Sequence, residues 1–466
     1  MAGVDDELVT PEEEDRLSRR ELLRKAGVGA VGLTAAGSAA SKAFAFAGPM
    51  RYKGRWLKGD LNILQWVHFV PAYDDWFDNT YIKQWGQKND VQVHVDHINN
   101  TQIPARAAAE VAAQSGHDMI EYLSPPAQYE RQVIDHAPIV QQIQSKVGKI
   151  SDLGRRSTYN PKTKKWFGVN HYYVPDPVVW RHDIWNGVGE SPATWDHVRA
   201  AAPKLKAAGH PIGIGQSQEL DSNMALIAFL MCFGGFIQND HNRPTLKGKN
   251  TVQAVQFMAD IYKRGEESDI FGWNPASNNQ YLYSGRGSLI LNAISATRTP
   301  EDQHLPFADD LWIWPIPRGP HGRLGLEHVM GVYSIWKFAK NKASAQKFVA
   351  DLCINYKNAT MASKLYNFPG FPGAMSFKQI HRVAAADTHK PRGKYSILTT
   401  IAEKYTHNVG YPGTTNAAID EIFSTFLIPQ MFADVSQGKK SAAQSVADTD
   451  KQVQKIFAKW RAAGLV

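Results

Sequence analysis

Residues 166–198 read WFGVNHYYVPDPVVWRHDIWNGVGESPATWDHV, and this stretch decides the fold. Pro175 and Pro177 each fix a backbone φ angle and remove a hydrogen-bond donor, so an ordinary central strand cannot run through them. The apolar run Val178–Trp180 resumes a strand, and a new helix begins after Ser191. The stretch therefore predicts a chain that leaves one layered domain and starts another, with aromatic side chains at the junction.

A strand–helix pattern precedes this junction. The segments 61–67, 91–97 and 117–122 are rich in strand-forming residues, and helical patterns at 76–88 and 105–115 separate them. This order predicts a parallel, doubly wound sheet, whose ligands bind beyond the carboxyl ends of the strands. The loops of interest are then those that start at Trp66 and at Glu121-Tyr122.

The order of these motifs resembles family 1 of the extracellular solute-binding proteins, the maltose-binding-protein-like receptors of sugar ABC importers. Gly168-Val169, the segment 179–185 and Pro192-Ala193-Thr194-Trp195-Asp196 follow the family's passage through its hinge, although Arg181 stands where the family usually has Asn. Further loose matches lie at 234–265, 283–292, 311–320, 341–348 and 368–374. The resemblance spans about Leu61 to Lys459.

The resemblance implies an α/β, two-lobed periplasmic-binding-protein-like fold of type II, with a mainly parallel sheet flanked by helices in each lobe and a ligand cleft at the hinge. Its implied lobes are 58–174 plus 310–360 and 175–309 plus 361–466. It also implies an extracytoplasmic receptor, a monomer, that delivers a mono- or oligosaccharide to the membrane permease subunits of an ABC importer. A polyamine or a phosphorylated polyol is the alternative ligand, and ferric ion is a weaker one.

Composition agrees with a soluble globular protein of two or three domains. The 466 residues exceed the usual ~150 residues per domain by a factor of about three. Hydrophobic residues make up 43% and charged residues 21%, and the net charge of +8 comes without a dense Lys/Arg block. These values give no reason to expect a nucleic-acid partner.

The N-terminus has the layout of an export signal. Arg19-Arg20 is followed by a small-residue stretch at 26–40, too short and glycine-rich for a membrane span, and by Ala43-Phe44-Ala45, which fits a cleavage site. We expect residues 1–47 to be a twin-arginine signal peptide and the mature protein to be periplasmic. A chain that folds before export does not rely on a disulfide, so Cys232 and Cys353 are expected to be separate buried thiols.

No catalytic motif is found, and the sequence predicts a binding protein without cofactor or metal rather than an enzyme. There is no H-E-x-x-H, Walker loop, G-x-S-x-G or dinucleotide fingerprint. His94 and Asp96 lie on one face of a predicted strand and His97 on the other, so the three cannot converge on a metal. A secreted glycoside hydrolase or a cofactor-bearing oxidoreductase exported in folded form stays the rival class.

The candidate ligand-binding residues are aromatic and polar side chains near the predicted loops. Aromatic faces cover the apolar patches of a ligand, and amides, carboxylates and imidazoles pair with its hydroxyls. The resemblance points to Asn292, just beyond a strand, and to His328, where the family usually has Gly. The aromatic candidates are Trp66, Tyr122, Tyr172 and Trp273, and the polar candidates are His68, Glu121, Asn170, His171, Asn274, Asn292 and His328.

Overall fold

The computed structural model describes residues 51–52, 55–57 and 59–466. The expected signal peptide at 1–47 lies outside the described residues.

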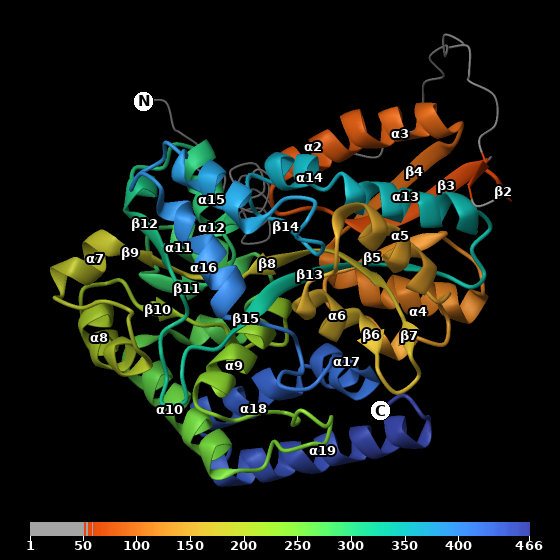
Figure 1. The fold of residues 1–466 in the computed structure, drawn as a ribbon. Helices are drawn as coiled ribbons and strands as arrows, with labels where there is room; N and C mark the ends of the chain where they lie inside the picture. Colours follow the sequence, from red (N-terminus) through yellow and green to blue (C-terminus); the bar gives the residue numbers. More distant parts are fainter. Residues whose placement is uncertain (1–50, 53–54, 58) are drawn as a thin grey trace, which may run out of the picture. The chain divides into compact units, whose positions relative to one another are not determined.

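A seven-stranded sheet, here the large sheet, contains the predicted β-α-β-α-β unit (Figure 1). Strand β3 pairs in parallel with β4 on one side and with β5 on the other, as the sequence predicts. The order is β14-β8-β13-β5-β3-β4, and β15 pairs with β13. The strands are β3 (Asp60–Trp66), β4 (Gln92–Ile98), β5 (Met119–Tyr122), β8 (Val169–Pro175), β13 (Gly325–Ile335), β14 (Phe368–Pro369) and β15 (Thr406–His407).

A four-stranded sheet, here the small sheet, has the order β10-β11-β9-β12. Its strands are β9 (Val178–Arg181), β10 (Ile212–Gly213), β11 (Leu289–Leu291) and β12 (Leu311–Trp314). Both sheets are mixed: β13 runs antiparallel to β5 and β8, and β9 runs antiparallel to β11 and β12. The expectation of mainly parallel sheets is therefore wrong in this detail, because the antiparallel strands β8, β9, β12 and β13 adjoin the two connections between the sheets.

The proline-containing junction is where the sequence predicts it. Pro175 ends β8 in the large sheet, and Val178 begins β9 in the small sheet, so the chain changes sheets across two residues. The other predicted lobe boundaries do not coincide with the positions at which the chain passes from one sheet to the other. Strand β12 belongs to the small sheet although it follows residue 310, and β14 pairs with β8 in the large sheet although it follows residue 361.

Two hydrophobic cores surround the sheets. Helices of the first core are α2 (Pro71–Trp76), α3 (Ile82–Asn89), α4 (Ile103–Ala113), α5 (Ala137–Val147), α6 (Asp152–Thr158), α11 (Ser277–Tyr283), α12 (Ser295–Asp302), α13 (Lys342–Ile354), α14 (Lys357–Ala362), α15 (Phe377–Ala385) and α16 (Ile397–Lys404). Those of the second core are α7 (His182–Gly187), α8 (Trp195–Ala207), α9 (Leu220–Cys232), α10 (Lys249–Gly265), α17 (Ala417–Ser424), α18 (Leu427–Ser436) and α19 (Ala442–Ala462).

Short elements connect these helices and strands. They are β1 (Arg51–Tyr52), β2 (Arg55–Trp56), β6 (Tyr159–Asn160) and β7 (Lys165–Trp166), a π-helical turn η1 (Phe77–Tyr81), and 3-10 turns η2 (Asn100–Gln102), η3 (Ala127–Tyr129), η4 (Ser268–Phe271), η5 (Ala308–Asp310) and η6 (Lys394–Ser396). The π turn lies between α2 and α3, so the predicted helix at 76–88 is one continuous helical segment with an irregular middle.

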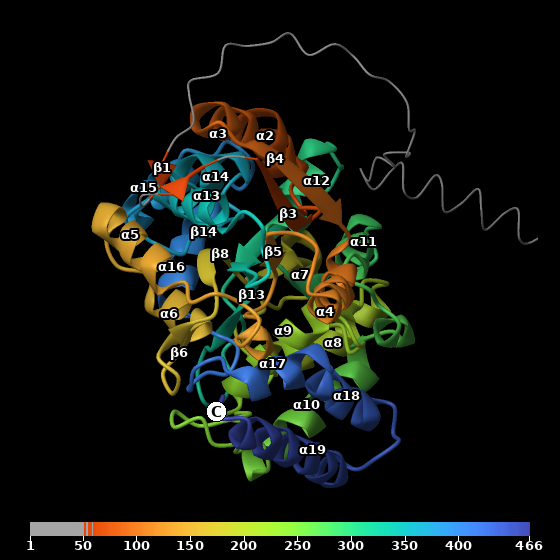
Figure 2. The same ribbon diagram turned by 90° about the vertical axis from the view of Figure 1, so that its right-hand side faces the viewer.

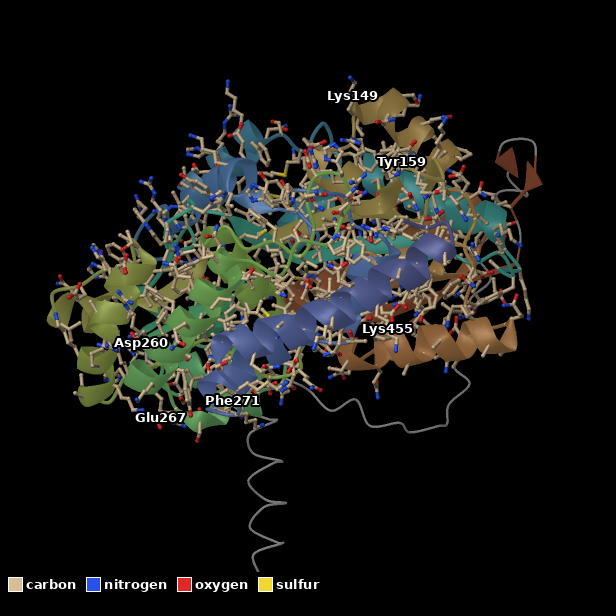
Figure 3. The ribbon with its side chains drawn as sticks, turned by 90° about the horizontal axis from the view of Figure 1, so that it is seen from below. Lys149, Tyr159, Asp260, Glu267, Phe271 and Lys455 are labelled. Atoms are coloured by element: carbon tan, nitrogen blue, oxygen red, sulfur yellow. The ribbon has the colours of Figure 1, made fainter. Side chains whose placement is uncertain are left out.

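The small sheet is buried on both faces, which explains its continuous apolar strands. Val179 and Ile313 pack in the first core, whereas their neighbour Val178 packs in the second, because side chains alternate along a strand. Figure 2 shows α17, α18 and α19 grouped near α9, and contacts join α17 and α18 to α19 and α18 to α9. Figure 3 shows the long helix α19 from below, with Lys455 on its exposed face.

The cysteines agree with the prediction: Cys232 and Cys353 are free and buried, and they lie in different cores. None of the helices in the described part of the chain is long and apolar enough to cross a membrane.

Candidate functional site

A cavity of about 430 Å³ lies between elements of the two cores. The first core contributes the start of α4 and the loop that follows β5, and the second core contributes the start of α9 and the turn between α17 and α18. The lining residues are Asn100, Thr101, Ile103, Pro104, Ala105, Tyr122, Leu123, Ser124, Gln218, Glu219, Leu220, Pro275, Phe423, Ser424 and Phe426. Because α4 and the β5 loop follow parallel strands, the cavity lies at the carboxyl edge of the large sheet, as predicted.

The lining suits a small ligand with both apolar and hydroxylated surfaces. Its volume is within the range of ~300–1,000 Å³ that is typical of small-molecule sites. Tyr122, Phe423 and Phe426 supply aromatic side chains, and amide, hydroxyl and carboxylate groups lie among them. Neither lysine nor arginine occurs among the described residues that line the cavity.

Glu219 is the one carboxylate of this lining, and it also caps α9. Its side chain accepts the backbone N–H of Asp221 at 2.7 Å and that of Ser222. Burial raises its pKa to about 8, and the charge of Asp221 adds to the increase. Glu219 also borders a second, much smaller cavity that Asp221, Trp273 and Asn278 line.

A buried acidic cluster lies next to Glu219, defined here as Asp176, Asp221 and His328. His328 Nδ1 lies 3.2 Å from Asp176 Oδ1, and His328 Nε2 lies 3.6 Å from Asp221 Oδ1. Asp221 Oδ2 accepts a hydrogen bond from Asn278 Nδ2 at 2.7 Å. The cluster therefore brings together the crossing segment between β8 and β9, the first turn of α9 and strand β13.

The surroundings of His328 favour its charged form. Burial lowers the pKa of His328, but the charge of Asp221 and the contact with Asp176 outweigh it, so the pKa is raised above its usual value. Burial raises the pKa of Asp221 to about 6, against the opposing effects of His328 and Asn278. The geometry thus places the imidazole ring of His328 between two acidic side chains.

The structure divides the predicted ligand-binding residues into three groups. Tyr122 lines the large cavity, Trp273 lines the small one, and His328 is in the acidic cluster. Asn274 and Asn292 line neither cavity, and their side chains form hydrogen bonds with residues nearby in the sequence. Asn274 Oδ1 accepts the backbone N–H of Ala276, and Asn292 Nδ2 donates to Asn279 Oδ1 at 2.7 Å.

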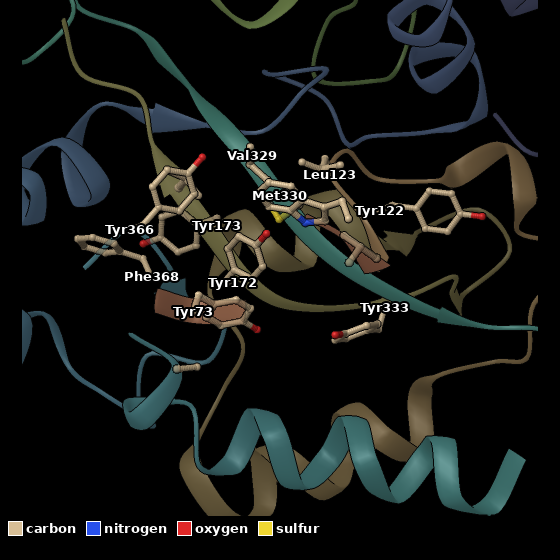
Figure 4. Packing of buried hydrophobic residues seen from close by; sticks show 14 of the residues in the cluster. Tyr73, Tyr122, Leu123, Tyr172, Tyr173, Val329, Met330, Tyr333, Tyr366 and Phe368 are labelled. Carbon is tan, nitrogen blue, oxygen red and sulfur yellow. The ribbon is translucent and has the colours of Figure 1, made fainter. Parts of the chain in front are cut away.

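The other predicted residues are buried in the first core: Trp66, His68, Glu121, Asn170, His171 and Tyr172. Figure 4 shows Tyr172 packed among Tyr73, Tyr333 and Tyr366. His171 Nε2 lies 2.9 Å from Glu121 Oε1, and Asn170 Nδ2 donates to the backbone oxygens of Tyr172 and Gly331. His68 Nε2 contacts Asn367 Oδ1 at 3.1 Å, and burial lowers its pKa to about 4.

Sequence reasoning missed several residues of the site. Glu219 has a recognisable signal, because an acidic N-cap precedes the apolar helix α9. Asp176 lies between the two prolines of the junction, and this position also marks it. Phe423 and Phe426 carry no such signal, since they come from the far end of the sequence. Metal-binding groups of three or more His, Cys, Asp or Glu side chains are absent from the part of the chain that the structure describes.

Comparison with known families places residues 80–391 in the bacterial extracellular solute-binding proteins. The chain belongs to this family. It is therefore an extracytoplasmic solute-binding protein, and the members of its family bind solutes rather than convert them. No match is found among curated protein sequences.

Solved structures agree on the fold. A solute-binding protein of Thermotoga lettingae bound to α-D-tagatose has a TM-score of 0.70 at 15% identity, over 86% of this chain and 100% of that one. The GacH receptor of Streptomyces glaucescens, solved with acarbose, has a TM-score of 0.70 at 14% identity, over 86% and 99%. A sugar transporter of Arthrobacter chlorophenolicus with bound laminaribiose has a TM-score of 0.70 at 16% identity, over 85% and 99%. At these identities the likeness establishes the two-lobed fold.

Proposed function

We propose that this protein captures a mono- or oligosaccharide in the cavity between its two lobes and delivers it to the membrane subunits of an ABC importer. The observation that carries the proposal is the cavity of about 430 Å³, which combines aromatic and polar side chains from both cores. A sugar presents apolar C–H faces and hydroxyl groups together, and this lining can contact both. The similar structures solved with tagatose, acarbose and laminaribiose support this ligand class.

The mechanism follows from the position of the cavity. Closure of the lobes about the crossing segments removes water from the ligand while its hydroxyls pair with polar side chains. We assign stacking contacts to Tyr122, Phe423 and Phe426 and polar contacts to Asn100, Gln218 and Glu219. The protein acts as a monomer, binds without turnover, and reaches the periplasm through the twin-arginine pathway.

Thermal shift and calorimetry with a panel of mono- to trisaccharides test the proposal. Saturation at a thousandfold excess over Kd stabilises the folded protein by roughly 4 kcal/mol, which is easily measured. Tyr122→Ala and Phe423→Ala should each weaken sugar binding about tenfold, since each removes an aromatic contact worth on the order of 1 kcal/mol.

Phe257→Ala is the matched control. Phe257 is a partly buried phenylalanine of the second core that lines neither cavity, so its removal should leave affinity unchanged. The absence of saturable binding by every saccharide, or the consumption of a bound sugar, contradicts the proposed function.

A further inference from the structure

We propose that the solute carries an ammonium group, so that amino sugars bind more tightly than their neutral or phosphorylated counterparts. The inference rests on the proposed function and refines its ligand class. It starts from the charges that lie beside the cavity.

Acidic side chains outnumber basic side chains next to the large cavity. Asp176, Glu219, Asp221 and Glu327 are all at least nine-tenths buried. Beyond the effect of burial, the charge of Asp221 raises the pKa of Glu219, and the charge of Asp176 raises the pKa values of Asp221 and Glu327. Among the described ion pairs of these four residues, the positive partner is His328. Arginine and lysine are missing from the described lining of both cavities. The region therefore has an excess of acidic groups over permanent positive charges.

Several buried polar atoms of this region also lack a hydrogen bond among the described residues, namely Asp176 Oδ1, Asp221 Oδ1, Glu327 Oε2, His328 Nδ1 and the Tyr366 hydroxyl. Asp221 Oδ1 has no hydrogen bond among the described residues, and at 3.6 Å its contact with His328 Nε2 is too long for one. The hydroxyl of the fully buried Tyr366 is likewise without a hydrogen bond among the described residues. Burial raises the pKa of Tyr366, and the charges of Asp221 and Asp176 add to the increase.

Glu219 connects these atoms to the large cavity. It lines that cavity and, on its other side, the small cavity of about 10 Å³ that Asp221 borders. Space of this size holds about one water molecule. A donor group at the end of a ligand in the large cavity can therefore interact with Glu219 and reach toward Asp221 with a small adjustment of the lining.

Ligand chemistry follows from this geometry. An unpaired buried carboxylate is unfavourable, and an ammonium group pairs with it and donates three hydrogen bonds. A phosphate needs arginine or lysine, and here it would face carboxylates instead. A neutral hydroxyl also donates a hydrogen bond, but it supplies no positive charge that would favour the ionised form of these acids.

The experiment compares matched sugars that differ at one substituent. Isothermal titration calorimetry measures the affinities of the amino, hydroxyl, N-acetylamino and phosphate forms of the same mono- and disaccharides, with glucosamine, glucose, N-acetylglucosamine and glucose 6-phosphate as the first set. We expect the amino form to bind about tenfold or more tightly than the hydroxyl form, because hydrogen bonds to charged groups are the stronger ones.

Asp221→Asn should reduce this preference to less than about threefold by removing the charge. Glu266→Gln is the matched control: Glu266 is a similarly buried acid that accepts the backbone N–H of Ile214 and lines neither cavity, and the preference should remain. Since Asp221→Asn can fail to fold, proton release on binding to the wild-type protein is a second readout. An ammonium group favours the ionised acids, so amino sugars should release protons at pH 7 and neutral sugars should not.

The released protons come from Glu219 and Asp221, whose pKa values are raised to about 8 and about 6, and Asp176, Glu327, His328 and Tyr366 are the charged or titratable neighbours that act on them or on one another. Equal affinity for amino and hydroxyl forms, or tighter binding of the phosphate form, overturns this inference while the sugar-binding function stands. A failure of all saccharides to bind overturns both.

Discussion

The first core and the junction between the two cores each bury a histidine beside a carboxyl group, but the histidine pKa values are shifted in opposite directions. His171 and Glu121 form one contact of 2.9 Å, and burial lowers the pKa of His171 and raises that of Glu121, which favours the neutral form of each. His328 lies between two aspartates, and its pKa is raised. Burial with one carboxyl partner thus favours a neutral histidine, whereas a second aspartate favours the charged form.

The largest expected effect is a loss of stability when the neutral pair in the first core is broken. His171→Ala removes a fully buried ring that stacks on Tyr333, with ring centroids 4.4 Å apart, and leaves the Glu121 carboxyl without its partner. We expect a loss of about 3 kcal/mol or more in the free energy of unfolding. Urea denaturation measures it. A loss below about 1 kcal/mol, or an unchanged stability with weaker ligand binding, would instead make His171 a ligand contact.

The two histidines should also give opposite pH dependences. A histidine with a raised pKa in the folded state contributes stability that is complete below the unfolded pKa of about 6.5 and is lost as the pH rises through the folded pKa. His328→Asn should therefore destabilise more at pH 6 than at pH 9. His171 has a lowered pKa, so the cost of His171→Asn should be complete above pH 6.5 and shrink as the pH falls.

Denaturation curves of both variants and the wild type between pH 5 and pH 9 test this prediction. If the loss in the free energy of unfolding changes with pH in the same direction for both variants, the two histidines do not differ in the way proposed here. Asp176 and Asp221 face His328 from two other elements, and the pKa of Asp221 is about 6, so part of the change near pH 6 belongs to that carboxyl.

Sequence patterns predicted the strands and the junction better than the site, and the reason is physical. The alternation of residues 61–67 and the prolines at 175 and 177 act locally, so strand and junction are visible in the chain itself. Whether a polar residue faces a cavity depends on which core covers it. His171 and His328 both lie in strands with polar neighbours, and their different surroundings come from Glu121 in one case and from α9 in the other. Phe423 reaches the cavity from some 300 residues beyond Tyr122.

The smallest effects on stability and ligand affinity should come from replacing either of two buried tyrosines by phenylalanine, which removes only the hydroxyl group. The Tyr333 hydroxyl donates to Gln65 Oε1 at 2.5 Å in the first core, so Tyr333→Phe should lower the free energy of unfolding by about 1 kcal/mol and leave ligand affinity unchanged. The Tyr366 hydroxyl has no hydrogen bond among the described residues, and the charges of Asp176 and Asp221 contribute to its raised pKa. Tyr366→Phe should change stability by less than about 0.5 kcal/mol but weaken ligand binding severalfold.

Urea denaturation and calorimetry on both variants separate the two roles. A stability loss for Tyr366→Phe as large as that for Tyr333→Phe would mean that this hydroxyl belongs to the folded core. An affinity loss for Tyr333→Phe would extend the ligand site into the large sheet. The pair is informative because each variant removes a single oxygen atom from a fully buried ring, so packing changes little and the difference reports the partner that the hydroxyl serves.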